Sequence, residues 1–495
     1  MAKILIIGGG AAGLCAGIRA RLEGHEALIL EKEKTPGGCL NSWEREGFHI
    51  DNCIHWLTGT NPKSESYKLW EEAGALGAGI PVIGAESLYT SERDGESLSL
   101  WRDLEKTERE MLLLSPGDEK EIRRFFGAVR ALQGVCGIGG KGHDEKITPK
   151  EALRAAPGLF SAWRETTGEM AKRFSHPLIR RFFTDLLTED FSALALLLVF
   201  CHFTAENGGI PAGGSDAMAK RMLRRFLSLG GRVESGFEVV RVREGKREVT
   251  AQSAGGERRK ADFAVLTLDP AVAFPVLLKE KLPPFFEKRL ASPKRARFSA
   301  CHAAFGVSLP SLPFRGDLVL HRGENRRLIL REFSHEPSFS PEGRCLLQAM
   351  EFCDEKRARY FLQLKKDPAA YRAEKDAFAR EAARAVEKRF PSLTGKLKLL
   401  DVWTPASYKR YLGTETGSFM GFAFAGGVLP KKAPCRIPGH KRLVLAGQWI
   451  EEPGGLPIAA ESGRRAALFI TRLAEKNERK NKAVSPFPVQ PEASS

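Results

Sequence analysis

The chain has 495 residues, of which 42% are hydrophobic and 28% charged, so it is a globular protein long enough for two or three domains and not a small disulfide-dependent fold. Its 77 Lys and Arg against 61 Asp and Glu give a formal net charge of +16, which favours an acidic partner such as anionic lipid or nucleic acid. The basic clusters are dispersed and match no nucleic-acid-binding motif, so a solvated basic surface is the simpler interpretation. Nine scattered cysteines include no CxxC pair, which argues against a disulfide framework or a metal site and for a reducing, cytoplasmic setting.

The first predicted unit is a βαβ fold. A short aliphatic strand at 3–7 ends in a glycine turn, a helix follows, and a second strand ends at Glu31. The turn carries Gly8, Gly10 and Gly13 in the spacing GxGxxG. Bare backbone lets a diphosphate approach the N–H groups at the helix N-terminus, where the partial charge is positive, and Glu31 can accept hydrogen bonds from a ribose. This pattern predicts a dinucleotide site.

Beyond this unit, helical stretches with Pro and Gly breaks extend from about residue 64 to residue 180, which we interpret as a separate, mostly helical unit. Strand patterns return at 232–242, 249–253, 263–266 and 442–446. We therefore expect a Rossmann-type domain assembled from three pieces, with a second unit inserted between them. The predicted boundaries are 1–75, 200–275 and 436–474 for the nucleotide-binding domain, 76–199 and 276–435 for the inserted domain, and 475–495 for a disordered tail.

Two further segments need an interpretation. The apolar run at 191–203 is too short to cross a bilayer, and it can be a core helix, the wall of a substrate tunnel or a shallow membrane contact. The glycines from Gly134 to Gly142 lack a strand-to-helix setting, so we interpret them as a surface loop and not as a second nucleotide site.

A second glycine pair, Gly37 and Gly38, precedes a hairpin-like stretch that ends near His55. Simple NAD binding does not require this pattern, which points to FAD. The stretch resembles the phytoene desaturase, carotenoid isomerase and retinol saturase group, a branch of the flavin amine oxidase superfamily. Later segments are similar to that group as well: 211–215 with 230–242 to its second FAD segment, 404–418 to a stretch beside the substrate cavity, and 446–467 to its C-terminal flavin motif.

The resemblance covers nearly the whole chain and implies an α/β fold, with a GR2-like Rossmann-type FAD-binding domain built from discontinuous segments and an inserted α+β substrate domain. FAD is the implied cofactor, with the main chain of Val239 at the adenine and the turn at 454–457 beneath the redox-active ring. A helix that begins at this turn can stabilise the negative charge of a reduced flavin. The residues predicted to bind FAD are Gly8, Gly10, Ala11, Ala12, Gly13, Glu31, Lys32, Gly37, Gly38, Cys39, His55, Val239, Thr267, Gly447, Gln448, Gly455, Leu456 and Pro457.

Two positions depart from the family pattern. Gln448 stands where relatives usually have Asp, and it can still hydrogen-bond the ribityl chain. Cys53 stands where they usually have Gly, and without a basic partner in the sequence we interpret it as a small buried side chain and not as a nucleophile. His55 and Trp56 are the candidate catalytic residues, and His55 is a candidate proton donor because it titrates near neutrality. The alternative is that both residues only pack.

From the resemblance we expect an FAD-dependent oxidoreductase that acts on carbon–carbon bonds of an apolar polyene or isoprenoid. It would be a desaturase, saturase or isomerase that transfers hydride to or from flavin N5. A flavin-dependent amine oxidase is the alternative on the same scaffold, and it would need a polar, aromatic-walled pocket. A third hypothesis is a basic membrane-binding or nucleic-acid-binding protein that retained the fold without catalysis.

The expected partners are an apolar small molecule, an unidentified electron donor or acceptor and, because of the charge, an anionic membrane surface reached from the cytoplasm.

Overall fold

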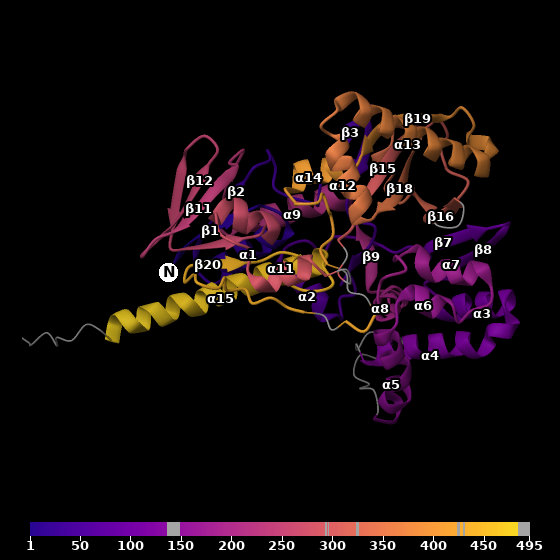
Figure 1. Cartoon of the computed structure of the whole chain (residues 1–495), viewed down its shortest axis with the longest axis horizontal. Helices are drawn as coiled ribbons and strands as arrows, with labels where there is room; N and C mark the ends of the chain where they lie inside the picture. The colour runs from indigo at the N-terminus through magenta and orange to yellow at the C-terminus, as the bar shows by residue number, and fades with distance from the viewer. Residues whose placement is uncertain are drawn as a thin grey trace, which may run out of the picture.

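The fold is described from a computed structural model of the chain, over residues 1–135, 149–292, 295, 297–322, 326–422, 426–428 and 431–483. Most of the glycine-rich stretch predicted as a surface loop, from Gly137 to Gly142, lies outside the described residues, as do residues 484–495. The chain forms two main sheets, which lie beside each other along the long axis of the molecule (Figure 1).

The first sheet has five parallel strands in the order β10-β2-β1-β14-β20. The strands are β1 (Lys3–Ile7), β2 (Glu26–Glu31), β10 (Arg232–Ser235), β14 (Phe263–Leu266) and β20 (Leu443–Leu445). Aliphatic side chains alternate along β1, so that Ile4 and Ile6 pack into one hydrophobic core while Leu5 and Ile7 pack into another on the opposite face. The sheet confirms the predicted Rossmann-type domain, whose strands come from separated stretches of the chain.

Three helices cover one face of this sheet, and a small antiparallel sheet covers the other. The helices are α1 (Ala11–Leu22), α9 (Gly214–Ser228) and α15 (Leu456–Ala483), and the small sheet consists of β11 (Val239–Glu244), β12 (Val249–Ser253) and β13 (Arg258–Ala261). Helices α1 and α15 approach closely at Gly463, where a Cβ atom would collide with the carbonyl oxygen of Ala12. Both helices begin beyond the carboxyl edge of the parallel sheet, which is where such sheets bind ligands.

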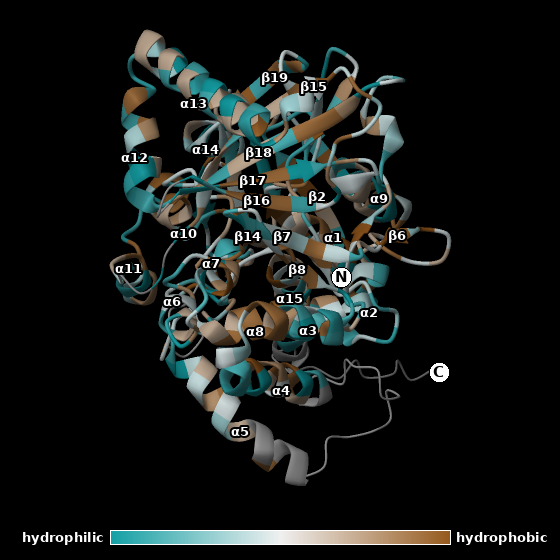
Figure 2. Cartoon of the chain, turned by 90° about the vertical axis from the view of Figure 1, so that its right-hand side faces the viewer, coloured by the Kyte–Doolittle hydropathy of each residue, from teal (hydrophilic) through white to brown (hydrophobic). Residues whose placement is uncertain are grey.

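The second sheet has seven strands in the order β19-β15-β18-β17-β16-β7-β8. The strands are β7 (Ser87–Arg93), β8 (Glu96–Trp101), β15 (Ser299–Val307), β16 (Asp317–Arg322), β17 (Arg326–Glu332), β18 (Cys345–Cys353) and β19 (Leu397–Trp403). One face packs against α12 (Glu355–Leu364) and α13 (Pro368–Arg389). The other face packs against a helical layer (Figure 2), which consists of α3 (Leu104–Leu114), α4 (Glu119–Val135), α5 (Pro149–Arg164), α6 (Thr167–Ala171), α7 (Pro177–Asp185) and α8 (Ala193–Thr204).

One prediction about these segments is wrong. Residues 64–180 are not a separate helical unit, because β7 and β8 join the seven-stranded sheet and the following helices share a hydrophobic core with it. Local periodicity predicts a helix or a strand but does not show which distant strand will pair with it. The strand pattern predicted at 232–242 is confirmed, and it divides into two strands, because Gly236, with a φ of 72°, separates β10 in the parallel sheet from β11 in the antiparallel one.

Shorter elements connect these layers. The strands are β3 (Ser42–Arg45) paired with β4 (Phe48–Asp51), and β9 (Gly208–Pro211) between β5 (Leu57–Thr58) and β6 (Val82–Ile83). The helices are α2 (Glu65–Glu72), α10 (Pro270–Val272) with a π-helical continuation at Ala273–Leu278, α11 (Pro284–Leu290) and α14 (Pro405–Leu412).

The predicted tail also differs from the structure where it begins. Helix α15 continues to Ala483, so the first residues after 475 are helical. Their Glu, Lys and Arg residues are good helix formers, although the same composition also suits a disordered segment.

We predict that Gly463→Ala destabilises the protein by about 1–3 kcal/mol, because the added Cβ forces α15 away from the backbone of α1. Gly127→Ala is the matched control, since Gly127 lies inside α4 with no atom near its missing Cβ, and it should stabilise by up to about 1 kcal/mol through helix propensity. Urea unfolding of both variants, saturated with FAD, measures the difference. Equal effects of the two changes would contradict the close packing of α1 on α15.

Candidate functional site

A continuous cavity of about 790 Å³ is lined by residues of both main sheets and of the segments between them. It brings together all the residues predicted to bind FAD except Gly13, and it includes the candidate catalytic residue Trp56. The predicted residues in its wall are Gly8, Gly10, Ala11, Ala12, Glu31, Lys32, Gly37, Gly38, Cys39, His55, Val239, Thr267, Gly447, Gln448, Gly455, Leu456 and Pro457. Motifs more than 400 residues apart in the sequence therefore share one site.

One end of the cavity is a cradle of bare backbone at the start of α1. Gly10 is the N-cap of the helix, it has no side-chain cap, and the first turn carries no acidic residue, so the first N–H groups of the helix are left for a ligand. A Cβ at Gly10 would lie 3.7 Å from the Cα of Gly38, and a Cβ at Gly8 would lie 2.6 Å from the Thr267 hydroxyl oxygen. The geometry suits a diphosphate that approaches the backbone closely.

Glu31 completes this end of the cavity. Its Oε2 accepts a hydrogen bond from the Gly9 N–H at 2.7 Å and its Oε1 accepts one from the Glu33 N–H at 2.9 Å. The carboxylate is thus fixed beside the glycine turn, and its remaining lone pairs can accept hydrogen bonds from ribose hydroxyls.

Gly13 does not line the cavity, so the structure differs from the prediction that it contacts the cofactor. A Cβ at Gly13 would collide with the carbonyl oxygen of Gly8. Its role is to let α1 pack against the end of β1, which is a packing requirement of the same glycine motif.

A second helix N-terminus lies at the other end of the predicted cofactor site. Leu456 begins α15 after Gly455, whose φ is 127°, and the first turn of this helix carries no acidic residue. Gly447, with a φ of 119°, donates its N–H to the Ser462 hydroxyl at 2.7 Å, which fixes the preceding turn to the same helix. The partial positive charge of this N-terminus stabilises a group that becomes anionic on reduction.

The amide of Gln448 lines the cavity and also holds a neighbouring stretch of backbone. Its Oε1 accepts a hydrogen bond from the Gly421 N–H at 2.8 Å, and its Nε2 donates to the Phe419 carbonyl at 2.9 Å. Both ends of the amide therefore hold the backbone of residues 419–421 against the cavity, and a spare lone pair of Oε1 and the second N–H of Nε2 are left for a ribityl hydroxyl.

The segment from Asp51 to Trp56 enters the cavity from β4 and is held from two sides. The Asp51 carboxylate accepts hydrogen bonds from the Ser215 N–H at 2.6 Å and the Cys53 N–H at 3.1 Å, and the Ser215 hydroxyl in turn accepts one from the Ile54 N–H at 2.8 Å. From the seven-stranded sheet, Gln348 donates to the Asp51 carbonyl at 2.9 Å.

The imidazole of His55 lies beside a buried ion pair. Arg331 makes two hydrogen bonds to the Asp317 carboxylate, at 2.7 and 2.6 Å, and donates to the carbonyls of Ile54 and His55 at 3.1 and 3.0 Å. Asp317 Oδ2 lies 3.8 Å from His55 Nδ1, and 32% of the His55 side chain is exposed. Because Nδ1 faces Asp317, Nε2 is the ring nitrogen left for a ligand in the cavity.

These charges set the ionisation of the pair. Burial works to raise the pKa of Asp317, but Arg331 and His55 outweigh it and lower that pKa to about 2. Burial and then Arg331 lower the pKa of His55 below its usual value, although Asp317 partly opposes them. At neutral pH the carboxylate is therefore ionised and His55 is mainly neutral.

Cys53 also lies in the cavity wall, close to Cys39. Hydrogen bonding with Cys39 and burial raise the pKa of the Cys53 thiol. The thiol is protonated at neutral pH, which agrees with a small wall residue and not with a nucleophile.

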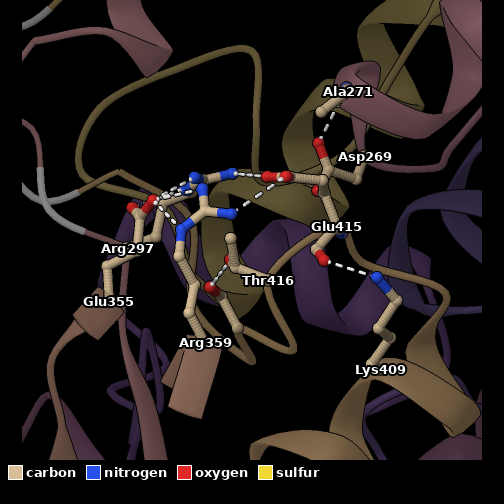
Figure 3. A network of polar contacts seen from close by, with 9 residues as sticks. Asp269, Ala271, Arg297, Glu355, Arg359, Lys409, Glu415 and Thr416 are labelled. Carbon is tan, nitrogen blue, oxygen red and sulfur yellow. Dashed lines mark hydrogen bonds and ion pairs between the residues drawn. The ribbon is translucent and has the colours of Figure 1, made fainter. Parts of the chain in front are cut away.

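A polar network holds the loop after α14 against the cavity (Figure 3). The buried Asp269 carboxylate, whose pKa is raised by burial, accepts hydrogen bonds from the Glu415 N–H at 3.0 Å and the Ala271 N–H at 2.9 Å. Arg297 bonds Glu415 at 2.8 Å and Glu355 at 2.9 Å. The cavity residues just before and after Glu415 thereby gain a fixed position.

Helix α8 forms an apolar wall on the far side of the cavity and explains the run at 191–203. Leu196, Leu197 and Phe200 are buried in the core beneath the helix. On another face Ala195, Leu198, Val199 and His202 line the cavity, together with Phe191 just before the helix. The run is thus both a core helix and a cavity wall.

Among the described residues, no group of three or more His, Cys, Asp or Glu side chains is placed to hold a metal ion, and none of the helices is both long and apolar enough to span a membrane.

The chain matches the model of the flavin-containing amine oxidoreductase family over residues 11–468. It belongs to this family. Prolycopene isomerase of Daucus carota is 23% identical over 88% of this chain and 73% of its own length, and a lycopene-forming phytoene desaturase of Pseudescherichia vulneris is 23% identical over 54% of each chain. Cyclohexylamine oxidase of Brevibacterium oxydans shares the fold, with a TM-score of 0.57 and 14% identity over 96% of this chain and 99% of its own.

These relationships confirm the predicted superfamily and its cofactor, FAD. The residues present fit this group, because one end of the cavity offers bare backbone and a helix N-terminus for a diphosphate and the other offers a second helix N-terminus for the ring. FAD supplies the capacity to accept or donate hydride, and the residues of this chain bind it, orient it and line the cavity beside it.

Sequence reasoning missed Asp317, Arg331 and His202, which the fold brings to the cavity or beside it. Asp317 and Arg331 face each other across β16 and β17, and no motif marks such a pair. The helical spacing of His202 from Ala195 and Leu198 was a usable signal, because residues at this spacing share a helix face.

We predict that Glu31→Ala weakens FAD binding by about 10- to 100-fold, since hydrogen bonds to a charged group contribute about 1.5–3 kcal/mol. The matched control is Glu33→Ala. It removes the same charge two residues further along the chain, and the Glu33 side chain is 46% exposed. Fluorescence titration of the apoprotein with FAD measures both affinities. An unchanged affinity in Glu31→Ala would show that this carboxylate does not contact the cofactor.

Proposed function

We propose that this FAD-dependent oxidoreductase acts on carbon–carbon bonds of an apolar polyene or isoprenoid, by hydride transfer between a substrate carbon and the flavin. The observation that carries the proposal is the apolar chamber beside the predicted ring position. The chamber is bounded by the cavity face of α8 and by Val319, Ile329, Met350 and Phe352 of the seven-stranded sheet.

The carboxylates in the cavity wall support this choice over an amine substrate. Asp317 is tied to Arg331, and Asp269 accepts hydrogen bonds from backbone N–H groups of the loops it joins. Glu31 and Glu238 lie at the nucleotide end. A cationic amine would therefore find no unpaired carboxylate among the described chamber residues, and removing it from water without a partner would cost several kcal/mol.

The names of the sequence relatives agree with an apolar polyene, since one is a prolycopene isomerase and the other a phytoene desaturase. Removal or addition of two hydrogens at neighbouring carbons requires a hydride and a proton. Bound FAD would supply or accept the hydride, and we assign the proton to His55, whose imidazole faces the cavity. The electron partner and the membrane surface expected from the net charge stay predictions.

The first test is anaerobic flavin reduction. The purified holoenzyme should bleach when mixed with a polyene substrate and should not bleach with primary amines, measured by flavin absorbance. Ala195→Trp, which fills the chamber wall, should keep bound FAD and lose bleaching, whereas Leu113→Trp, at an 81% exposed position of α3, should retain both. Bleaching by amines alone would replace this proposal with an amine oxidase.

A second test uses the pH dependence assigned to His55. The groups that face it are Asp317, Arg331, Asp51 and His302, of which the two carboxylates raise its pKa. Asp317→Asn removes the larger of these effects and leaves the charge of Arg331, so the pKa of His55 should fall further. Flavin reduction by the substrate needs neutral His55 to accept the proton, so its rate should fall at acid pH, and in Asp317→Asn this fall should move to a lower pH than in the wild type.

Stopped-flow flavin kinetics across pH measure this shift. The fall in rate at acid pH should be absent in His55→Gln and unchanged in Asp94→Asn, whose side chain is 83% exposed and does not line the cavity. If the rate falls at the same pH in Asp317→Asn and in the wild type, His55 does not have this role.

A further inference from the structure

We propose that His202 donates a hydrogen bond to an oxygen atom of the substrate, so that the preferred substrate is an apolar chain with a hydroxyl or carbonyl group and not a pure hydrocarbon. This inference rests on the proposed function and names the substrate class more closely.

The hydrogen bonds around Asn207 determine which way its amide faces. Its Oδ1 accepts a hydrogen bond from the backbone N–H of Asn61 at 3.1 Å, so Nδ2 is the end that faces His202. Nδ2 lies 3.1 Å from the Nδ1 atom of His202. Asn207 is fully buried, and its own backbone bonds the carbonyl of His202 and the N–H of Gly59, so this orientation is held on all sides.

The orientation of Asn207 in turn determines the tautomer of His202. An amide NH₂ can only donate, so Nδ1 must accept and carries no proton. Burial lowers the pKa of His202, so the ring is neutral near pH 7 and its one proton lies on Nε2. Within the described part of the chain Nε2 has no hydrogen-bond partner, and His202 lines the cavity.

The place of His202 on α8 puts its Nε2–H donor inside the chamber. His202 lies on the cavity face of α8, one turn beyond Leu198 and two turns beyond Ala195. The chain then turns into β9, which pairs with β5, and a Cβ at Gly208 of β9 would collide with the ring of Trp56. His202 is thus the polar end of an apolar wall, on the side of the chamber that adjoins Trp56.

The chemistry of the donor selects the ligand. A neutral N–H left unpaired in an apolar cavity weakens ligand binding by about 10-fold or more, which a hydrocarbon cannot offset and a carbonyl or hydroxyl oxygen can. A protonated amine has no acceptor to offer it. Sites built around one fixed polar group discriminate most strongly against ligands that lack its partner.

The experiment compares two polyenes of equal length, one a hydrocarbon and one with a terminal alcohol, by titrating each into the anaerobic holoenzyme and following the flavin absorbance. The wild type should bind the alcohol about 10-fold more tightly or better, which is the ratio expected from one satisfied donor. His202→Phe should abolish this preference by weakening the alcohol alone.

Two further variants distinguish the effect of the N–H donor from the effect of side-chain bulk in the cavity wall. His202→Gln retains an N–H donor and should restore part of the preference, whereas Leu198→Phe changes the bulk of the same helix face and should alter both affinities alike. Equal binding of the two polyenes by the wild type, or a preference that persists in His202→Phe, overturns the inference and leaves the proposed function standing. If neither polyene perturbs or bleaches the flavin, both fail.

Discussion

Asp51 lies at the end of β4, where the FAD-binding domain meets the seven-stranded sheet, and its buried carboxylate accepts hydrogen bonds from the backbone of Ser215 and Cys53. From the opposite side Arg331 donates to the carbonyls of Ile54 and His55. A buried carboxylate or guanidinium is costly unless its hydrogen bonds are made, so this short segment has one favourable position. It carries His55 and Trp56 into the cavity, and the arrangement of the site therefore depends on it.

The cavity joins two kinds of wall because it lies between two kinds of sheet. At the parallel sheet, tight turns follow β1 and β20 and two helices begin, which leaves N–H groups and little side-chain bulk. At the seven-stranded sheet, aliphatic side chains face the helical layer and continue into the chamber. A charged cofactor and the apolar substrate that we propose could thus meet in one continuous space, whose wall includes His55 and His202.

The cofactor half of the site could be predicted because its signals are local. The glycines near residue 10 and Glu31 lie within one βαβ unit, and the second glycine turn precedes its own helix, so spacing alone implies the chemistry. The same signals cannot separate contact from packing. Gly13 belongs to the motif but supports the strand, and Gln448 lies in the cofactor motif but holds residues 419–421.

By itself the sequence determined the superfamily and FAD as the cofactor and predicted the residues around the two ends of the cofactor site, since each is encoded in short continuous motifs. Only the tertiary structure decided that β7 and β8 complete the second sheet, that Asp317 and Arg331 flank His55, and that Asn207 sets the proton position on His202. These features come from pairing between distant strands and from hydrogen-bond direction. Neither leaves a periodic or spaced pattern in the chain, because the free energy that selects them arises after the layers have packed.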